Sequence, residues 1–361
     1  MRFAFFGSSL VSAYWNGAAT YYRGLLKALA ARGHEVSFFE PDAFERQAHR
    51  DIADPDWARV TVFAPDAEGM EKALRAAAAS DVVVKFSGVG VLDRELEEAV
   101  LAMRRPGRIA IFWDVDAPAT LDSVAADPGD PLRRQVPGYD AVFTYGGGDA
   151  VVAAYRKLGA RLCLPVYNAL DPGTHHRVAP EPRFAVDLAF LGNRLPDREA
   201  RVESFFLAPA AMLPGRRFLL GGNGWSDKPM TPNIDYVGHV YTRDHNALNS
   251  SARAVLNINR ESMARYGASP PTRIFEAAGA AACIITDRWE GIEAFLEPER
   301  EILLAADGGD VAAHLEALDT ARARAIGEAA ARRVLASHTY AHRAVQVEAA
   351  LEGRDFMREA V

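Results

Sequence analysis

Short runs of consecutive apolar residues recur along the chain and are separated by longer amphipathic segments. Runs without polar alternation are typical of parallel strands that are covered on both faces of a sheet. Parallel strands need crossover connections, so the first half of the chain predicts an α/β, doubly wound sheet. The expected strands are Arg2–Phe6, Val36–Glu40, Asp81–Phe86, Arg108–Trp113, Asp140–Tyr145 and Arg161–Pro165, with helices over Gly17–Arg32, Leu92–Arg104 and Asp149–Leu158.

The same pattern returns in the second half of the chain. The expected strands are Asp187–Gly192, Arg216–Gly222, Ile234–Tyr241, Ala254–Asn259, a run that ends at Asp287, and Glu301–Ala305. Helices are expected from near Pro196 and over Arg243–Ser250, Glu290–Phe295, Asp310–Val334 and Tyr340–Leu351. The segment 168–182 lacks periodicity and is rich in Pro, His and Asp, which predicts an interdomain linker. We therefore expect two Rossmann-like domains, 1–167 and 183–337, followed by a helical segment at 338–361.

Composition narrows the class of protein. The 361 residues are 49% hydrophobic and 25% charged, as in a globular protein of two domains. A net charge of −7 argues against non-specific nucleic-acid binding and against a basic membrane anchor. No apolar stretch approaches a membrane span, and the apolar run at the start is too short for a signal peptide. Cys163 and Cys283 lie in apolar runs and are expected to be buried thiols, so we expect a cytoplasmic location.

Ligands of such sheets bind beyond the carboxyl ends of the strands, so the residues after each strand are the candidates. Small and polar residues follow the first strand and leave room for a donor or acceptor molecule: Gly7, Ser8, Ser9, Asn16 and Gly17. Their spacing is not GxGxxG, which disfavours a dinucleotide site. A dinucleotide site would also need an acidic residue at the end of the second strand, and Glu40 is the only one there. The alternative is a simple strand-to-helix turn.

Two carboxylates follow the strand Arg108–Trp113, and we consider both as catalytic candidates. Asp114 or Asp116 at this strand exit can serve as a general base or can orient a hydroxyl group. A helix cap is an equally good explanation for Asp116.

The stretch Ser269–Asp287 has the clearest binding signature of the second half. It predicts a loop, a short helix, a turn and a buried strand. Arg273 and Glu276 lie three residues apart and share one face of that helix. The free N–H groups at the helix start, next to a cation, suit an anion, and the carboxylate suits a polyhydroxyl group. A nucleotide diphosphate sugar has both features, whereas the simpler alternative is a surface ion pair.

The other strand exits of the second half converge on this helix if the sheet is doubly wound. Arg260 and Arg273 then supply charge for a diphosphate without a metal ion. The candidates for the nucleotide and base are Asn193, Gly222, Gly224, Trp225, His239 and Tyr241, and Asn259 and Thr272 are placed in the donor or acceptor cleft. Each aromatic residue has core packing as its alternative. His175 and His176 lack partners at ligand spacing, so no metal site is predicted.

Several segments resemble GT-B glycosyltransferases and, more closely, the CgeB-like (spore-maturation protein) group. They include FWDVDAPATL, TYGGGDAV, YNALDP, AFLGNRLPDREARVE, GGNGW and SPPTRIFEAAGAAACIITD, and the resemblance spans nearly the whole chain.

The resemblance implies two Rossmann-like domains facing a cleft. A nucleotide-sugar donor would bind the C-terminal domain, an unidentified acceptor would bind the N-terminal domain, and no cofactor would be needed. Glu276 matches the glutamate that holds the ribose, whereas Ala268 stands where many relatives have another glutamate. The final helix would cross back to the N-terminal domain. Two alternatives remain, a non-catalytic nucleotide-sugar-binding protein and a GT-B-fold nucleotide-sugar epimerase.

Overall fold

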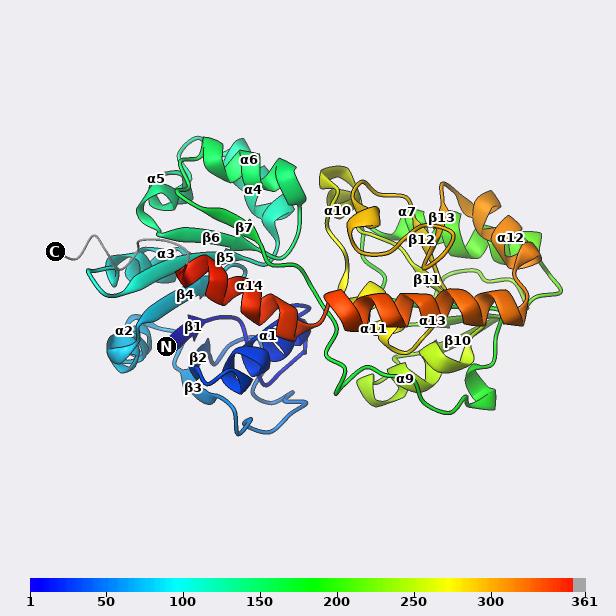
Figure 1. The fold of residues 1–361 in the computed structure, drawn as a ribbon, viewed down its shortest axis with the longest axis horizontal. Coiled ribbons are helices and arrows are strands. Elements are labelled where there is room, and N and C mark those ends of the chain that lie inside the picture. The colour runs from blue at the N-terminus through cyan, green and yellow to red at the C-terminus, as the bar shows by residue number, and fades with distance from the viewer. Residues whose placement is uncertain (353–361) are drawn as a thin grey trace. The chain divides into compact units, whose positions relative to one another are not determined.

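The computed structural model describes residues 1–352, which form two compact units (Figure 1). Unit 1 consists of Met1–Asn168 together with the segment from Tyr340 onward, and unit 2 consists of Ala169–Thr339. Each unit contains one sheet whose strands all pair in parallel. The predicted fold class, two α/β units with doubly wound parallel sheets, is confirmed. Residues 353–361 of the predicted segment 338–361 lie outside the described residues.

The sheet of unit 1 has the strand order β3-β2-β1-β4-β5-β6-β7. The strands are β1 (Arg2–Phe6), β2 (Glu35–Pro41), β3 (Arg59–Phe63), β4 (Val82–Phe86), β5 (Ile109–Asp114), β6 (Ala141–Thr144) and β7 (Cys163–Pro165). The central strands β4, β5 and β6 are buried over their whole length, as the continuous apolar runs predict. The chain order reverses between β1 and β4, and ligands of such sheets bind at this kind of switch point.

The helices of unit 1 are α1 (Ala19–Ala31), α2 (Ala67–Ala76), α3 (Asp93–Ala102), α4 (Ala117–Ala126), α5 (Leu132–Gln135), α6 (Gly148–Lys157) and α14 (Tyr340–Glu352). The last helix returns to this unit and packs beside α1 (Figure 1, red and blue). Tyr340 lies flat against α1 because Gly24 has no side chain; a Cβ there would come within 2.1 Å of the ring. Arg32 and Glu348 form an ion pair of 2.6 Å between the two helices.

The sheet of unit 2 has the strand order β10-β9-β8-β11-β12-β13. The strands are β8 (Leu188–Leu191), β9 (Phe218–Gly221), β10 (Ile234–Gly238), β11 (Ala254–Asn257), β12 (Ile284–Asp287) and β13 (Leu303–Ala305). The helices are α7 (Glu199–Val202), α8 (Ala208–Met212), α9 (Thr242–Ser251), α10 (Glu261–Tyr266), α11 (Thr272–Gly279), α12 (Gly308–Ala317) and α13 (Thr320–Ser337). The core between sheet and helices includes Phe190, Phe206, Phe218, Trp225 and Ile285, which are all nearly or fully buried.

The structure departs from the predicted elements in a few places. The strand β3 has a half-exposed surface, so it contains no continuous apolar run that would mark it in the sequence. The helical region expected over Asp310–Val334 is two helices, because the carboxylate of Asp319 accepts from Arg322 N at 2.7 Å and starts α13 afresh. Residues 169–182, expected to be a linker, pack within unit 2, where Ser250 and Ser251 of α9 accept from Val178 N and Glu181 N.

Two further properties concern the whole described chain. No helix within residues 1–352 is long and apolar enough to cross a membrane. Cys163 and Cys283 are both buried free thiols, and burial raises the pKa of each to about 12. Both thiols are therefore protonated at neutral pH and behave as small apolar side chains.

Candidate functional site

A pocket of about 260 Å³ lies at the carboxyl ends of β8, β9 and β10 in unit 2. Residues from three strand exits and from the first turn of α11 line it. Four residues proposed from the sequence are brought together here: Asn193, Gly222, His239 and Arg273. The pocket occupies the edge of a doubly wound sheet at which ligands bind.

Two glycines allow the backbone at β8 and β9 to come close enough to form this pocket. Gly222 has φ of +125°, and a Cβ on it would lie 2.2 Å from the carbonyl oxygen of Gly192. A Cβ on Gly192 would in turn meet the guanidinium of Arg198 at 2.7 Å. The side-chain oxygen of Asn193 accepts from Asn223 N at 2.9 Å and joins the two loops. Any side chain at Gly222 would therefore separate the loops or close the pocket.

Two arginines, Arg198 and Arg273, line the pocket. The spacing of Arg273 and Glu276 marks Arg273 in the sequence, whereas no local pattern marks Arg198. Burial and the nearby guanidinium groups of Arg273 and Arg260 lower the pKa of Arg198 to about 10. Burial also lowers the pKa of Arg273, while Glu276 opposes the shift. The Nε of Arg198 is buried and has no hydrogen-bond partner among residues 1–352. Buried donors of this kind are rare, and an anion in the pocket would satisfy this one.

Arg260 lies beside the pocket and does not line it. Its Nε donates to Asp197 at 2.6 Å, and its charge contributes to the lowered pKa of Arg198. Three arginines thus gather near one strand edge. Arg260 and Arg273 both lie near Arg198, and their predicted role in binding a diphosphate stays a prediction.

Glu276 lies one turn after Arg273 on α11, and its carboxylate has a histidine neighbour that the sequence did not reveal. His175 Nε2 lies 3.5 Å from Glu276 Oε1, and the two side chains are 4% and 13% exposed. A second histidine, His245, lines the pocket, with its ring centroid 6.3 Å from that of His175. Burial lowers the pKa of His245, so the imidazole is neutral at pH 7.

The start of α11 is half-buried, with Thr272 as its first residue. Asn259, at the exit of β11, is buried; its N–H donates to Asp287 at 3.0 Å, and its side-chain Nδ2 has no partner within the described part of the chain. Thr272 and Asn259 therefore lie at the carboxyl-end edge of the sheet of unit 2, although neither lines the pocket.

The prediction that Trp225 contacts the nucleotide or base is wrong. Trp225 is fully buried in the core of unit 2, and its Nε1 donates to the carbonyl of Gly192 at 2.7 Å. It cannot present a ring face to a base, and it instead supports the loop that forms the pocket. Gly224, beside it, has φ of +88° and allows the chain to turn against Arg194.

His239 and Tyr241 differ from Trp225 in their exposure. His239 lines the pocket, and Tyr241 is 59% exposed. Their ring centroids lie 4.7 Å apart in an edge-to-face contact. This pair leaves aromatic surface available at the pocket, so a role in stacking stays a prediction.

A larger cavity of about 520 Å³ lies at the amino ends of β8, β9, β11 and β12. It is lined by arginines that already form ion pairs: Arg177 and Arg324 with Glu328, Arg217 with Asp235, and Arg253 with Asp187. The smaller pocket at the carboxyl ends is the better candidate for an anion, since Arg198 there is buried beside the like charges of Arg273 and Arg260.

In unit 1, the structure corrects the role expected for Asp114. The carboxylate is fully buried and accepts from Ser87 Oγ at 2.7 Å, from Thr120 Oγ1 at 3.0 Å and from the hydroxyl of Tyr155. Burial raises its pKa, and these hydrogen bonds oppose the shift. With its oxygens already occupied, Asp114 is a structural anchor and not an open base. Asp116 N donates to it at 3.0 Å, and the side chain of Asp116 is half-buried at the start of α4.

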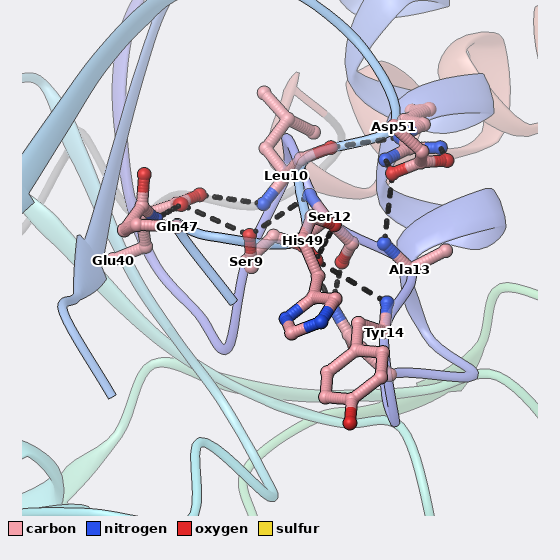
Figure 2. Close-up of polar contacts among 11 residues, drawn as sticks. Ser9, Leu10, Ser12, Ala13, Tyr14, Glu40, Gln47, His49 and Asp51 are labelled. Atoms are coloured by element: carbon pink, nitrogen blue, oxygen red, sulfur yellow. Dashed lines mark hydrogen bonds and ion pairs between the residues drawn. The ribbon is translucent and has the colours of Figure 1, made fainter. Parts of the chain in front are cut away.

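The loop between β1 and α1 is tied to a buried carboxylate, as Figure 2 shows. Glu40 is fully buried and accepts from Ser9 Oγ at 2.9 Å, from Leu10 N at 2.6 Å and from Gln47 Nε2 at 2.6 Å. The carboxylate of Glu40 is therefore already occupied by hydrogen bonds from within unit 1. Ser9 thus serves the loop rather than a ligand.

The other candidates in this loop have different surroundings. Ser8 Oγ donates to Asn16 at 2.9 Å, and both side chains are buried. Gly7 packs against Phe38, where a Cβ would come within 2.6 Å of the ring, whereas a Cβ on Gly17 would enter open space. The serines and Asn16 fix the loop, so the prediction that they line a cleft has no support from their burial.

No group of three or more His, Cys, Asp or Glu side chains that could hold a metal ion occurs in residues 1–352.

Residues 198–349 match the family model described as "Glycosyl transferase-like". A search of curated proteins found no match to the sequence.

Solved structures resemble nearly the whole chain. Anabaena HepE, solved with UDP and glucose, has 12% identity and a TM-score of 0.68, with 98% of this chain and 100% of that chain covered. Sucrose-phosphate synthase from Thermosynechococcus elongatus has 14% identity and a TM-score of 0.72, with 98% of each chain covered. An α-glucosyltransferase, solved with UDP-glucose and DNA, has 12% identity and a TM-score of 0.72, with 98% and 100% covered. These likenesses establish that the chain has the GT-B fold.

Proposed function

We propose that the protein is a glycosyltransferase that moves a sugar from a nucleotide-sugar donor, bound in unit 2, to an acceptor hydroxyl. One observation is decisive for this proposal. Arg198 and Arg273 meet in a glycine-lined pocket at the carboxyl ends of β8 to β10, and a buried Nε of Arg198 lacks a partner within residues 1–352. The GT-B fold and the family match over 198–349 support the same reaction class.

The arginines are proposed to bind the diphosphate of the donor. Negative charge grows on the leaving nucleotide as the glycosidic bond breaks, and preformed guanidinium donors offset that charge. Guanidinium groups match phosphate geometry, so this chemistry needs no metal ion. Arg260 adds positive charge from beside the pocket and keeps Asp197 neutralised.

The nucleoside is proposed to lie along α11 and β10. Glu276 accepts hydrogen bonds from the ribose hydroxyls, one turn away from the diphosphate contact at Arg273. The exposed ring pair of His239 and Tyr241 stacks against the base. We propose UDP as the nucleotide, because several structures with the same fold were solved with UDP or UDP-glucose.

Unit 1 is proposed to bind the acceptor. Its carboxyl-end strand edge includes Asp116, which is half-buried and replaces Asp114 as the candidate base. Membership in the CgeB-like group is a further part of this proposal and rests on the sequence segments quoted above.

Two other functions remain as alternatives to this proposal. A non-catalytic nucleotide-sugar-binding protein is favoured by Ala268, which lacks a carboxylate where many GT-B enzymes have one. The backbone at Ala268 has φ of +35°, and a Cβ on Gly291 would lie 3.1 Å from the Cβ of Ala268. Hydrolysis of UDP-glucose without an acceptor would exclude this alternative. A nucleotide-sugar epimerase would be identified by interconversion of UDP-sugars without transfer.

Thermal unfolding with UDP, dTDP, GDP, ADP and CMP tests the proposal. A nucleotide at 100 times its Kd stabilises a protein by about 2.7 kcal/mol. We expect UDP to give the largest shift, and we expect Arg273→Ala and Glu276→Ala each to reduce transfer by roughly 10²–10³-fold. Arg300→Ala, which removes an arginine that is 73% exposed, is the matched control. No shift with any nucleotide, or full transfer by both pocket variants, would refute the proposal.

A further inference from the structure

The environment of His175 is more constrained than its sequence position suggests. The residue lies in the segment 168–182, which the sequence predicts to be a linker, yet its side chain is only 4% exposed. Its Nε2 lies 3.5 Å from Oε1 of Glu276, and its Nδ1 is buried with no hydrogen-bond partner in the described chain. Buried imidazole nitrogens normally have partners, so this pair needs an explanation.

A tight turn fixes the backbone of His175. The side chain of Asp171 accepts from Gly173 N at 2.9 Å and from Thr174 Oγ1 at 3.0 Å, and its carbonyl accepts from His175 N at 2.9 Å. Asp side chains commonly form such Asx turns by accepting from the backbone that follows them. These local hydrogen bonds fix the backbone that leads into His175.

Two helices of unit 2 hold this turn in place. Asn246 of α9 donates from Nδ2 to Thr174 O at 2.9 Å and accepts from His176 N at 3.2 Å. On α11, Gly279 leaves room for the turn, since a Cβ there would come within 2.9 Å of the carbonyl oxygen of His175. The backbone around His175 is thus held between α9 and α11, and α11 is the helix that presents Arg273 and Glu276.

We propose that His175 is a positioning residue for Glu276 and thereby determines selectivity for a ribose in the nucleotide. With its proton on Nε2, the imidazole donates to Oε1 of Glu276 and holds the carboxylate in one rotamer. The second oxygen, Oε2, then faces the ribose hydroxyls. The contact of 3.5 Å shortens when the nucleotide binds, because such hydrogen bonds often tighten only in the complex. This inference rests on the proposed function, since it takes Glu276 as the ribose contact.

Calorimetric titrations with UDP, 2′,3′-dideoxyuridine diphosphate and pyrophosphate test the assignment. In the wild type, we expect UDP to bind at least tenfold more tightly than the dideoxy analogue, because the hydroxyls donate to a charged acceptor. In His175→Ala, this preference falls below threefold, while the Kd for pyrophosphate changes by less than twofold. The preference is a difference between two ligands in one variant, so a simple loss of folded protein does not alter it.

Two further variants separate positioning from packing. His175→Gln places an amide near Nε2 and is expected to restore most of the preference for UDP, whereas His175→Asn places its amide near Nδ1 and is expected not to restore it. His176→Ala changes the exposed neighbouring histidine and should leave all three affinities unchanged.

The inference is overturned if His175→Ala keeps the wild-type preference for UDP over the dideoxy analogue, or if the variant weakens all three ligands equally. The inference is also overturned if His175→Gln restores no more of the preference for UDP than His175→Asn does. A wild type that binds neither UDP nor another nucleotide would instead refute the proposed function, and the inference with it.

Discussion

Replacing Arg198 with Met should stabilise unit 2 while weakening nucleotide binding. The pKa of Arg198 falls from 12.5 to about 10 because the guanidinium is buried beside Arg273 and Arg260. Each pKa unit corresponds to about 1.36 kcal/mol, so keeping the protonated group in the folded state costs roughly 3 kcal/mol. At pH 7 the group is protonated in both the folded and the unfolded state, because pH 7 lies below both pKa values. The charge of Arg198 therefore destabilises the folded state, relative to the unfolded state, by this full amount.

Met keeps most of the aliphatic packing and removes the charge. If about half of the cost is recovered, the free energy of unfolding rises by roughly 1.5 kcal/mol, which raises Tm by about 3–6 °C for a unit of this size. Loss of a hydrogen bond to a charged group costs about 1.5–3 kcal/mol, so the Kd for UDP should rise roughly 10–100-fold. Calorimetric unfolding of the apoprotein and titration with UDP measure the two effects independently.

Arg300→Met is the matched control, since that side chain is 73% exposed and should change neither quantity. The reasoning would be refuted if Arg198→Met lowered Tm and left the UDP affinity unchanged. That outcome would mean that contacts within the chain stabilise the charge of Arg198 and that no anion binds to it.

Three further predictions address other parts of the molecule. Asp114→Ala leaves buried donors without an acceptor and should lower the free energy of unfolding by more than about 3 kcal/mol, while transfer measured well below its Tm stays within a fewfold of wild type. Gly222→Ala should abolish the stabilisation by UDP, whereas Gly215→Ala, whose Cβ enters open space, should not. Because burial lowers the pKa of His245, the unfolded state binds a proton on this imidazole more tightly than the folded state does. The free energy of unfolding, measured in urea, should therefore be highest above about pH 6.5 and should fall toward pH 5. His245→Gln should make that fall shallower.

Local patterns were sufficient to predict the fold. The continuous apolar runs at β4, β5, β8 and β11 mark buried parallel strands, because both faces of each strand are covered. The edge strand β3 escaped prediction although its sequence RVTVF is rich in β-branched residues, because its half-exposed surface leaves no continuous apolar run. The helices α4, which has Pro118 in its first turn, and α10, which is short, were also not predicted, because neither has a clear helical period in the sequence.

The site was less predictable, because its chemistry depends on contacts between distant segments. Arg273 and Glu276 were found from their spacing on one helix. The burial of Asp114 depends on Ser87 and Tyr155, which lie 27 and 41 residues away, so its strand-exit position alone suggested an open base. The strand-exit position of Trp225 likewise did not show that its indole points into the core.

The return of α14 to unit 1 has a consequence for the order in which the chain folds during synthesis. The surface of α1 that receives Tyr340 is complete early, but its partner is translated only after the whole of unit 2. Until then, a nascent unit 1 exposes the apolar side of α1 around Gly24 to the ribosome surface and to chaperones. A chain that stops at Thr339 would retain this exposure permanently. The last helix therefore makes translation of unit 2 a condition for closing the first unit.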